Sequence, residues 1–230
     1  MEVEHVEEVI KYLGMEGKIN PDKLLGEINI TFSNYPFTAP ITNLPECDLS
    51  NKEKEVNGYS VSGPMGSGKS TIVNILVKHG YKQYTFADAL KDIVAYLFNL
   101  DRKLLEGDTD ESRMWREKEI PGTNITPRFI LQRMGTDVFR KFDSNIWLDA
   151  LDNRLSGNVA VTDARFLNEL HFCKNKNIKT IRVIRPSLPV LPNQHISETE
   201  HTQYNDYDYV IVNDGSLVDL ETKVNYILAK

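Results

Sequence analysis

A glycine-rich segment, GPMGSGKS at residues 63–70, constrains the fold of this 230-residue chain more than any other feature. It follows a short strand pattern at residues 59–62 and precedes a helical pattern that runs from Lys69 to His79. A strand, a G-x-x-x-x-G-K-[ST] loop and a helix in this order are typical of phosphate-binding α/β proteins. The alternative, a glycine-rich turn that binds nothing, would not need this context.

The residue types of this loop suit a nucleoside triphosphate. The glycines let the backbone turn so that N–H groups face phosphate oxygens, and the positive end of the following helix points at the same anion. Lys69 is expected to neutralise the β- and γ-phosphates, and Ser70 to offer its hydroxyl to Mg²⁺. We therefore predict an ATP site with Mg²⁺, formed by Gly63, Gly66, Ser67, Gly68, Lys69, Ser70 and Thr71.

Strand and helix patterns alternate from residue 57 onward, which is typical of a parallel α/β sheet. We expect a doubly wound domain over residues 58–230, with a helical insert at 102–156 and a lid at 186–207 that is polar and contains three prolines. The five expected strands are residues 59–62, 81–86, 158–162, 180–184 and 209–212.

Residues 1–57 have a different character and are interpreted as an N-terminal extension. Residues 3–13 have the apolar spacing of an amphipathic helix, residues 27–33 alternate like a half-buried strand, and residues 50–55 resemble a polar linker. These 57 residues hold 11 acidic and 5 basic side chains, so the net charge of −6 belongs to them, and the rest of the chain is neutral.

Composition excludes several classes of protein. An acidic chain is a poor non-specific binder of nucleic-acid polymers, although a mononucleotide needs only a local positive cluster. No apolar run reaches the length of a membrane helix, and the acidic start, MEVEHVEEVI, is unlike a signal peptide. Cys47 and Cys173 lack metal-binding spacing and are expected to be reduced thiols. We therefore expect a cytoplasmic protein without a membrane partner.

A second anion site is predicted from the positions of Asp163 and the arginines. Asp163 directly follows the apolar strand NVAVT, where it would reach a metal, directly or through water, or would cap the next helix. All ten arginines lie between residues 102 and 185, and guanidinium groups bind phosphate in a bidentate fork. Arg128, at a helix start, and Arg185, at a strand end, are the better candidates for phosphate binding. Arg182 alternates on a strand and is expected to pack. The arginines that we expect on the surface are Arg133, Arg140 and Arg154.

Two phosphate sites in one chain indicate phosphoryl transfer from a bound triphosphate to a bound monophosphate. Seven segments agree with this interpretation and occur in this order: FADALK (86–91), TPRFILQRMGTD (126–137), IWLDAL (146–151), VTDARFLNE (161–169), VIRP (183–186), HISE (195–198) and IVNDGSLVDL (211–220). Together they resemble the phage and viral deoxynucleoside monophosphate kinases, over roughly residues 57–230.

The resemblance implies a P-loop fold of the nucleoside monophosphate kinase type, a five-stranded parallel sheet with a monophosphate-binding helical insert and a short lid. It also implies ATP- and Mg²⁺-dependent phosphorylation of a deoxynucleoside 5′-monophosphate to the diphosphate, in the host cytoplasm for a viral protein. The implied catalytic residues are Lys69, Asp163, Arg165 and Arg185. The implied acceptor residues are Lys91, Arg113 or Arg116, Arg128, Gln132, Gly135, Thr136, Trp147, Asp163, Arg165 and Glu169.

Several alternatives stay open at this point. Trp147 is either an aromatic residue of a nucleoside pocket or a core residue, and His195 and Glu198 are more easily interpreted as structural than as catalytic. The acceptor is a deoxynucleotide or another phosphate monoester, such as phosphomevalonate or dephospho-coenzyme A; Trp147 and Gln132 favour the nucleotide. A non-catalytic nucleotide-binding module is the third hypothesis, which the presence of Lys69 and the arginines opposes. A homodimer is also left open.

Overall fold

The computed structural model of the chain describes residues 3–33, 35, 43–45, 55–189 and 200–230. Cys47, His195, Glu198 and most of the predicted linker lie outside them. The chain forms two compact units. We call Asn51–Phe86 with Leu155–Lys230 the sheet unit, and Met1–Ser50 with Ala87–Arg154 the helical unit.

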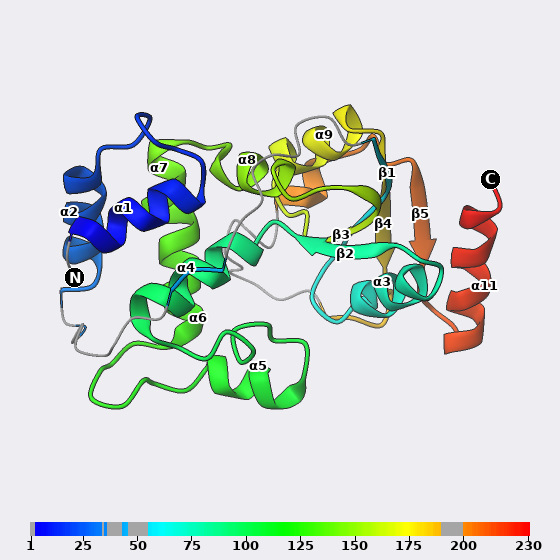
Figure 1. The fold of residues 1–230 in the computed structure, drawn as a ribbon. Helices are drawn as coiled ribbons and strands as arrows, with labels where there is room; N and C mark the ends of the chain where they lie inside the picture. Colours follow the sequence, from blue (N-terminus) through cyan, green and yellow to red (C-terminus); the bar gives the residue numbers. More distant parts are fainter. Residues whose placement is uncertain (1–2, 34, 36–42, 46–54, 190–199) are drawn as a thin grey trace. The chain divides into compact units, whose positions relative to one another are not determined.

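The sheet unit contains a five-stranded, wholly parallel sheet in the order β2-β3-β1-β4-β5 (Figure 1). All five expected strands are confirmed within a few residues: β1 Val56–Ser62, β2 Lys82–Thr85, β3 Gly157–Thr162, β4 Ile178–Ile184 and β5 Tyr209–Val212. Because β1 lies in the middle with β3 and β4 on either side, the loop after β1 is flanked by the ends of both neighbouring strands.

Helices cover both faces of this sheet, which confirms the predicted α/β fold. Val61 of β1 belongs to a core with α3 (Lys69–Lys78) and α11 (Leu217–Leu228). The adjacent Ser60 points the other way, toward Cys173 of α9 (Leu167–Asn175). Burial raises the pKa of the Cys173 thiol to about 12, so this thiol stays protonated at neutral pH. A short 3₁₀ helix, Glu200–Gln203, completes this unit.

The helical unit has a hydrophobic core of its own, to which both the N-terminal segment and the expected insert contribute. Val6, Ile28, Ile93 and Met134, from four different helices, are all fully buried in this core. The structure thus divides the chain differently from the predicted boundary at residue 57. The helices are α1 Val3–Tyr12, α2 Pro21–Thr31, α4 Asp88–Phe98, α5 Asp110–Arg116, α6 Pro127–Gln132, a π-helix Arg133–Phe139, α7 Arg140–Phe142 and α8 Ile146–Asp152 (Figure 1).

The predicted strand at residues 27–33 is wrong, because most of this segment belongs to α2. The helix begins at Pro21, and the Asn20 side chain caps it by accepting a hydrogen bond from the backbone N–H of Lys23 at 3.0 Å. Ile28 is fully buried whereas Ile30 is 78% exposed, so the two do not share a face as strand alternation requires. The expected helix at residues 3–13 is confirmed as α1.

Candidate phosphate-transfer site

The glycine-rich loop turns sharply at the carboxyl end of β1. Gly63 has φ +150° and Gly68 has φ +103°, and a Cβ atom at these positions would lie 2.6 Å from the Val183 carbonyl oxygen and 2.4 Å from the Asn213 amide nitrogen. Only glycine fits both the angles and the space. The Lys69 ammonium donates to the carbonyl oxygens of Gly63 at 2.6 Å and Pro64 at 2.8 Å, so it lies folded over the loop.

Residues at the ends of β4 and β5 brace this loop from outside. The Arg185 guanidinium donates to the Gly66 carbonyl oxygen at 3.1 Å, which brings this predicted catalytic residue to the phosphate loop. Asn213 donates its side-chain amide to the Ser67 carbonyl oxygen at 2.8 Å and its backbone N–H to the Ile184 carbonyl oxygen at 2.7 Å. Sequence reasoning did not select Asn213, although its position directly after the last strand was a usable signal.

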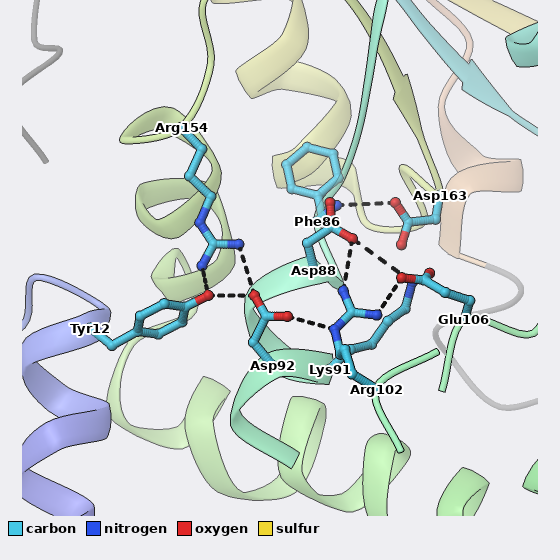
Figure 2. Close-up of polar contacts among 9 residues, drawn as sticks. All are labelled: Tyr12, Phe86, Asp88, Lys91, Asp92, Arg102, Glu106, Arg154 and Asp163. Atoms are coloured by element: carbon cyan, nitrogen blue, oxygen red, sulfur yellow. Dashed lines mark hydrogen bonds and ion pairs between the residues drawn. The ribbon is translucent and has the colours of Figure 1, made fainter. Parts of the chain in front are cut away.

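Asp163 stands at the same edge of the sheet, one residue after β3. Strand pairing places Thr162 opposite Val61, so Asp163 emerges level with the start of the phosphate loop. Its Oδ1 atom accepts a hydrogen bond from the backbone N–H of Phe86 at 3.1 Å (Figure 2). The alternative role as a helix cap is excluded, because α9 begins four residues later, at Leu167.

The next turn is shaped by Glu169, whose side chain is buried. Its carboxylate accepts hydrogen bonds from the backbone N–H groups of Arg165 at 2.8 Å and Phe166 at 3.1 Å. The hydroxyl of Ser62 donates to the carbonyl oxygen of Ala164 at 2.8 Å and ties this turn to the end of β1. Glu169 therefore positions the backbone of Arg165, and direct contact of Glu169 with an acceptor stays a prediction.

The sheet unit thus contains the expected ATP residues together with Asp163, Arg165, Glu169 and Arg185, whereas the other expected acceptor residues belong to the helical unit. Arg128 forms an ion pair with Glu117 at 2.9 Å. Arg113 donates to the carbonyl oxygens of Gly107 at 3.1 Å and Asp108 at 2.8 Å. The Arg116 guanidinium lies against Gly107, where a Cβ atom would be 1.9 Å from its Nη2 atom. Arg113 and Arg116 therefore both contact the short loop at Gly107 and Asp108.

Gln132, Gly135 and Thr136 lie at the junction of α6 with the π-helix. We expected an ordinary helix here, but the structure has a seven-residue π-helix. This form is rare in proteins overall, and where it occurs it is often at a functional site. Gly135 is closely packed, since a Cβ atom there would lie 2.8 Å from Cδ2 of Leu90. The segment is thus locally specialised at the residues that the resemblance selected.

Trp147 is a core residue in this structure, which agrees with the second of its two interpretations. Its side chain is only 4% exposed, and its indole N–H donates to the Gly135 carbonyl oxygen at 2.9 Å. Its ring packs edge-on against Phe139 at 5.3 Å. A stacking role for Trp147 against a nucleobase has no support from this burial.

Lys91 is also buried and belongs to a group of charged side chains in the helical unit (Figure 2). Its ammonium lies 2.7 Å from Oε2 of Glu106. Burial alone would raise the pKa of Glu106, but Lys91 and Arg102 outweigh it and hold that pKa below its ordinary value. Lys91 is therefore committed to an ion pair here, and its predicted contact with a monophosphate stays a prediction.

Two further observations concern metals and membranes. Among the described residues, no group of three or more His, Cys, Asp or Glu side chains is arranged to hold a metal ion. Within the same parts of the chain, every helix is too short or too polar to cross a bilayer.

Comparison with known protein families agrees with the resemblance expected from the sequence. Residues 115–224 match the family model of deoxynucleotide monophosphate kinase. The match includes the π-helix, the Asp163 turn and strands β3 to β5. It confirms the resemblance to deoxynucleotide monophosphate kinases and supports a phosphotransferase, whereas the glycine-rich loop precedes the matched residues. No curated protein matches the chain significantly.

Three solved structures are similar to this chain at low scores. TT1252 from Thermus thermophilus is 19% identical, with a TM-score of 0.42, over 76% of this chain and 98% of its own. Dephospho-CoA kinase from Campylobacter jejuni is 15% identical, with a TM-score of 0.38, over 76% and 97%. The APS kinase CysC from Mycobacterium tuberculosis, a Cys556Ala mutant, is 14% identical, with a TM-score of 0.34, over 77% and 100%.

Proposed function

We propose that this chain transfers the γ-phosphoryl group of ATP to a deoxynucleoside 5′-monophosphate and forms the diphosphate in the cytoplasm. The observation that carries the proposal is the family match over residues 115–224, in a chain whose glycine-rich loop turns at Gly63 and Gly68, where only glycine fits. The family supplies the kind of acceptor, and the loop supplies the donor site.

The donor site follows from groups that already converge on the loop. Lys69 now donates to two loop carbonyl oxygens, and a bound triphosphate would offer it charged phosphate oxygens, which form stronger hydrogen bonds. The buried Ser67 hydroxyl has no hydrogen-bond partner among the described residues, so an additional polar atom would satisfy it. Arg185 lies against the loop at Gly66, where it would stabilise charge that develops on the transferred group.

The residues of the loop fit a magnesium ion that is shared with the phosphates. Mg²⁺ prefers oxygen ligands and is usually held by one or two protein groups together with phosphates and water. Ser70 at the start of α3 has an exposed side chain, and Asp163 stands at the same sheet edge. In the proposal these two residues hold the ion, which neutralises phosphate charge during transfer.

In the helical unit, the arginines are the proposed contacts of the acceptor, and the role of Arg165 in the sheet unit stays a prediction. Arg128 and Arg113 both have ion-pair partners, Glu117 and Asp110, and phosphate would compete with those carboxylates for the guanidinium groups. The proposal names no preferred base, because the buried Trp147 ring offers no surface on which a base could stack. A different phosphate monoester therefore remains the second candidate, favoured by this burial alone.

A panel assay tests the proposal. ADP release from Mg-ATP is measured with dTMP, dGMP, dCMP, dAMP, CMP, phosphomevalonate and dephospho-coenzyme A as acceptors. We expect turnover with at least one deoxynucleotide, and its loss in Lys69→Ala. The matched control is Lys78→Ala, which removes an exposed lysine from the other end of the same helix. Turnover with phosphomevalonate or dephospho-coenzyme A alone would select the second candidate, and none at all would reject the kinase.

A further inference from the structure

A hydrogen-bonded chain of side chains in the helical unit starts in the N-terminal helix α1 (Figure 2). The Tyr12 hydroxyl donates to Oδ2 of Asp92 on α4 and accepts a hydrogen bond from the Arg154 guanidinium. Arg154 also contacts Oδ2 of Asp92 at 3.4 Å. Tyr12 thus joins α1 to α4 through a specific polar contact in addition to the shared hydrophobic core.

Asp92 is the centre of this chain. Its Oδ1 atom accepts a hydrogen bond from Nε of Arg102 at 2.5 Å, so one carboxylate holds donors from three separate segments. The Asp92 side chain is only 13% exposed. In such surroundings hydrogen bonds to a charge are strong, and removal of one donor leaves the partly buried carboxylate with fewer contacts to fix its position.

Arg102 links Asp92 to the segment that follows α4. Its guanidinium donates to Oε1 of Glu106, whose other oxygen receives the Lys91 ammonium at 2.7 Å. Between them, Leu105 is fully buried in the hydrophobic core of this unit. Residues 102–106 are therefore held against α4 by charge on one side and by apolar packing on the other.

The next two residues, Gly107 and Asp108, contact the expected acceptor arginines. Gly107 and Asp108 offer the carbonyl oxygens that bind Arg113, and Gly107 also supports the Arg116 guanidinium. The directions of both arginines thus depend on where this loop stands. The loop in turn depends on Arg102, and through it on Asp92.

We propose that Tyr12 and Asp92 are positioning residues for acceptor binding. They hold the loop at residues 102–108 so that Arg113 and Arg116 are oriented before the monophosphate arrives, which reduces the entropy lost on binding. The N-terminal segment is then part of the acceptor site's support. This inference rests on the proposed function, because it requires that one of these arginines binds the acceptor phosphate.

Two tyrosine variants form a matched test. Tyr12→Phe removes the hydroxyl that contacts Asp92. Tyr96→Phe removes a hydroxyl on α4 that donates to Glu8 of α1, so it breaks a similar contact between the same two helices. Tyr96 has no hydrogen bond to Asp92 or Arg102, so its loss leaves the arginine loop held. Both variants are expected to lower the Tm by a similar amount.

The two variants are expected to differ at the arginine loop. Hydrogen–deuterium exchange at residues 102–108 should be faster in Tyr12→Phe and unchanged in Tyr96→Phe. The KM for the monophosphate should rise about fivefold in Tyr12→Phe alone, which corresponds to about 1 kcal/mol of binding. The KM for ATP should stay the same in both variants. A general loss of stability would not raise the KM for the monophosphate selectively.

Three results would overturn the inference: unchanged exchange at residues 102–108 in Tyr12→Phe, faster exchange without a change in the KM for the monophosphate, or an equal rise of that KM in both variants. The exchange measurement needs no activity, so it tests the positioning chain independently of the reaction. A wild-type chain without turnover on any monophosphate would instead reject the proposed function, and the binding role of the chain with it.

Discussion

The contact between Asn213 and the phosphate loop leads to a quantitative prediction for ATP binding. The Asn213 amide donates to the carbonyl oxygen of Ser67 at 2.8 Å, and Ser67 is fully buried. Asn213→Ala removes this hydrogen bond and leaves a carbonyl oxygen without its donor. The net contribution of such a bond is about 0.5–1.5 kcal/mol, and we use the upper part of this range because Ser67 is buried.

The variant should therefore bind ATP about five- to tenfold more weakly, because about 1–1.4 kcal/mol of support for the bound loop geometry is lost. The assay is the KM for ATP at saturating monophosphate, together with the KM for the monophosphate at saturating ATP. Only the first should rise. Asn213→Asp should be worse than Asn213→Ala, since it adds a negative charge near the expected triphosphate.

Asn225→Ala is the control, because Asn225 is an exposed residue of α11, which begins shortly after Asn213. It should leave both KM values unchanged. Equal rises in the two KM values for Asn213→Ala, or no rise in either, would refute the reasoning that this residue acts by shaping the phosphate loop.

Three further predictions concern the helical unit. Arg128→Ala should raise the KM for the monophosphate at least about tenfold with little effect on the KM for ATP, whereas Arg133→Ala, at an exposed site, should change neither KM. Equal effects on both KM values would contradict the assignment of Arg128 to the acceptor. Trp147→Phe should lower the free energy of unfolding by about 1–3 kcal/mol without changing either KM, and a selective rise in the KM for the monophosphate would instead restore its role in a nucleoside pocket. Ile28→Lys should unfold the protein or nearly so, while Ile30→Lys should be almost neutral by thermal denaturation, because only Ile28 is buried; similar losses for both would contradict the helix at this segment.

Much of the sheet unit was predictable, since local patterns and tertiary environment agree there. Buried parallel strands are rich in apolar residues, as in the VAV core of NVAVT, and a glycine-rich loop between a strand and a helix is specific in itself. The parallel strands also bring their carboxyl ends to one edge, which is why Asp163 and Arg185 could be expected at this edge from their positions in the sequence. Asn213 was missed because its role is a side-chain contact with the loop after another strand.

The helical unit was less predictable, because its segments come from distant parts of the sequence. The alternation of Ile28, Ile30 and Phe32 resembles a strand, and only packing reveals that Ile30 is exposed while Ile28 and Phe32 are buried. Trp147 and Lys91 have residue types that suit a ligand site, yet one is buried in the core and the other is paired with Glu106. Spacing along the chain contains neither fact.

The sequence by itself therefore determined the phosphate loop, the alternation of strands and helices around it, and the resemblance that the family match confirms. These are properties of contiguous segments, where the backbone conformation and the residue pattern are local. Only the tertiary structure decided that the N-terminal helices share a core with the insert and that Tyr12 is linked to Arg102 through Asp92. Burial and ion pairing depend on which distant segments meet, so the glycine-rich loop was visible in the sequence, whereas the contacts that hold residues 102–106 against α4 were not.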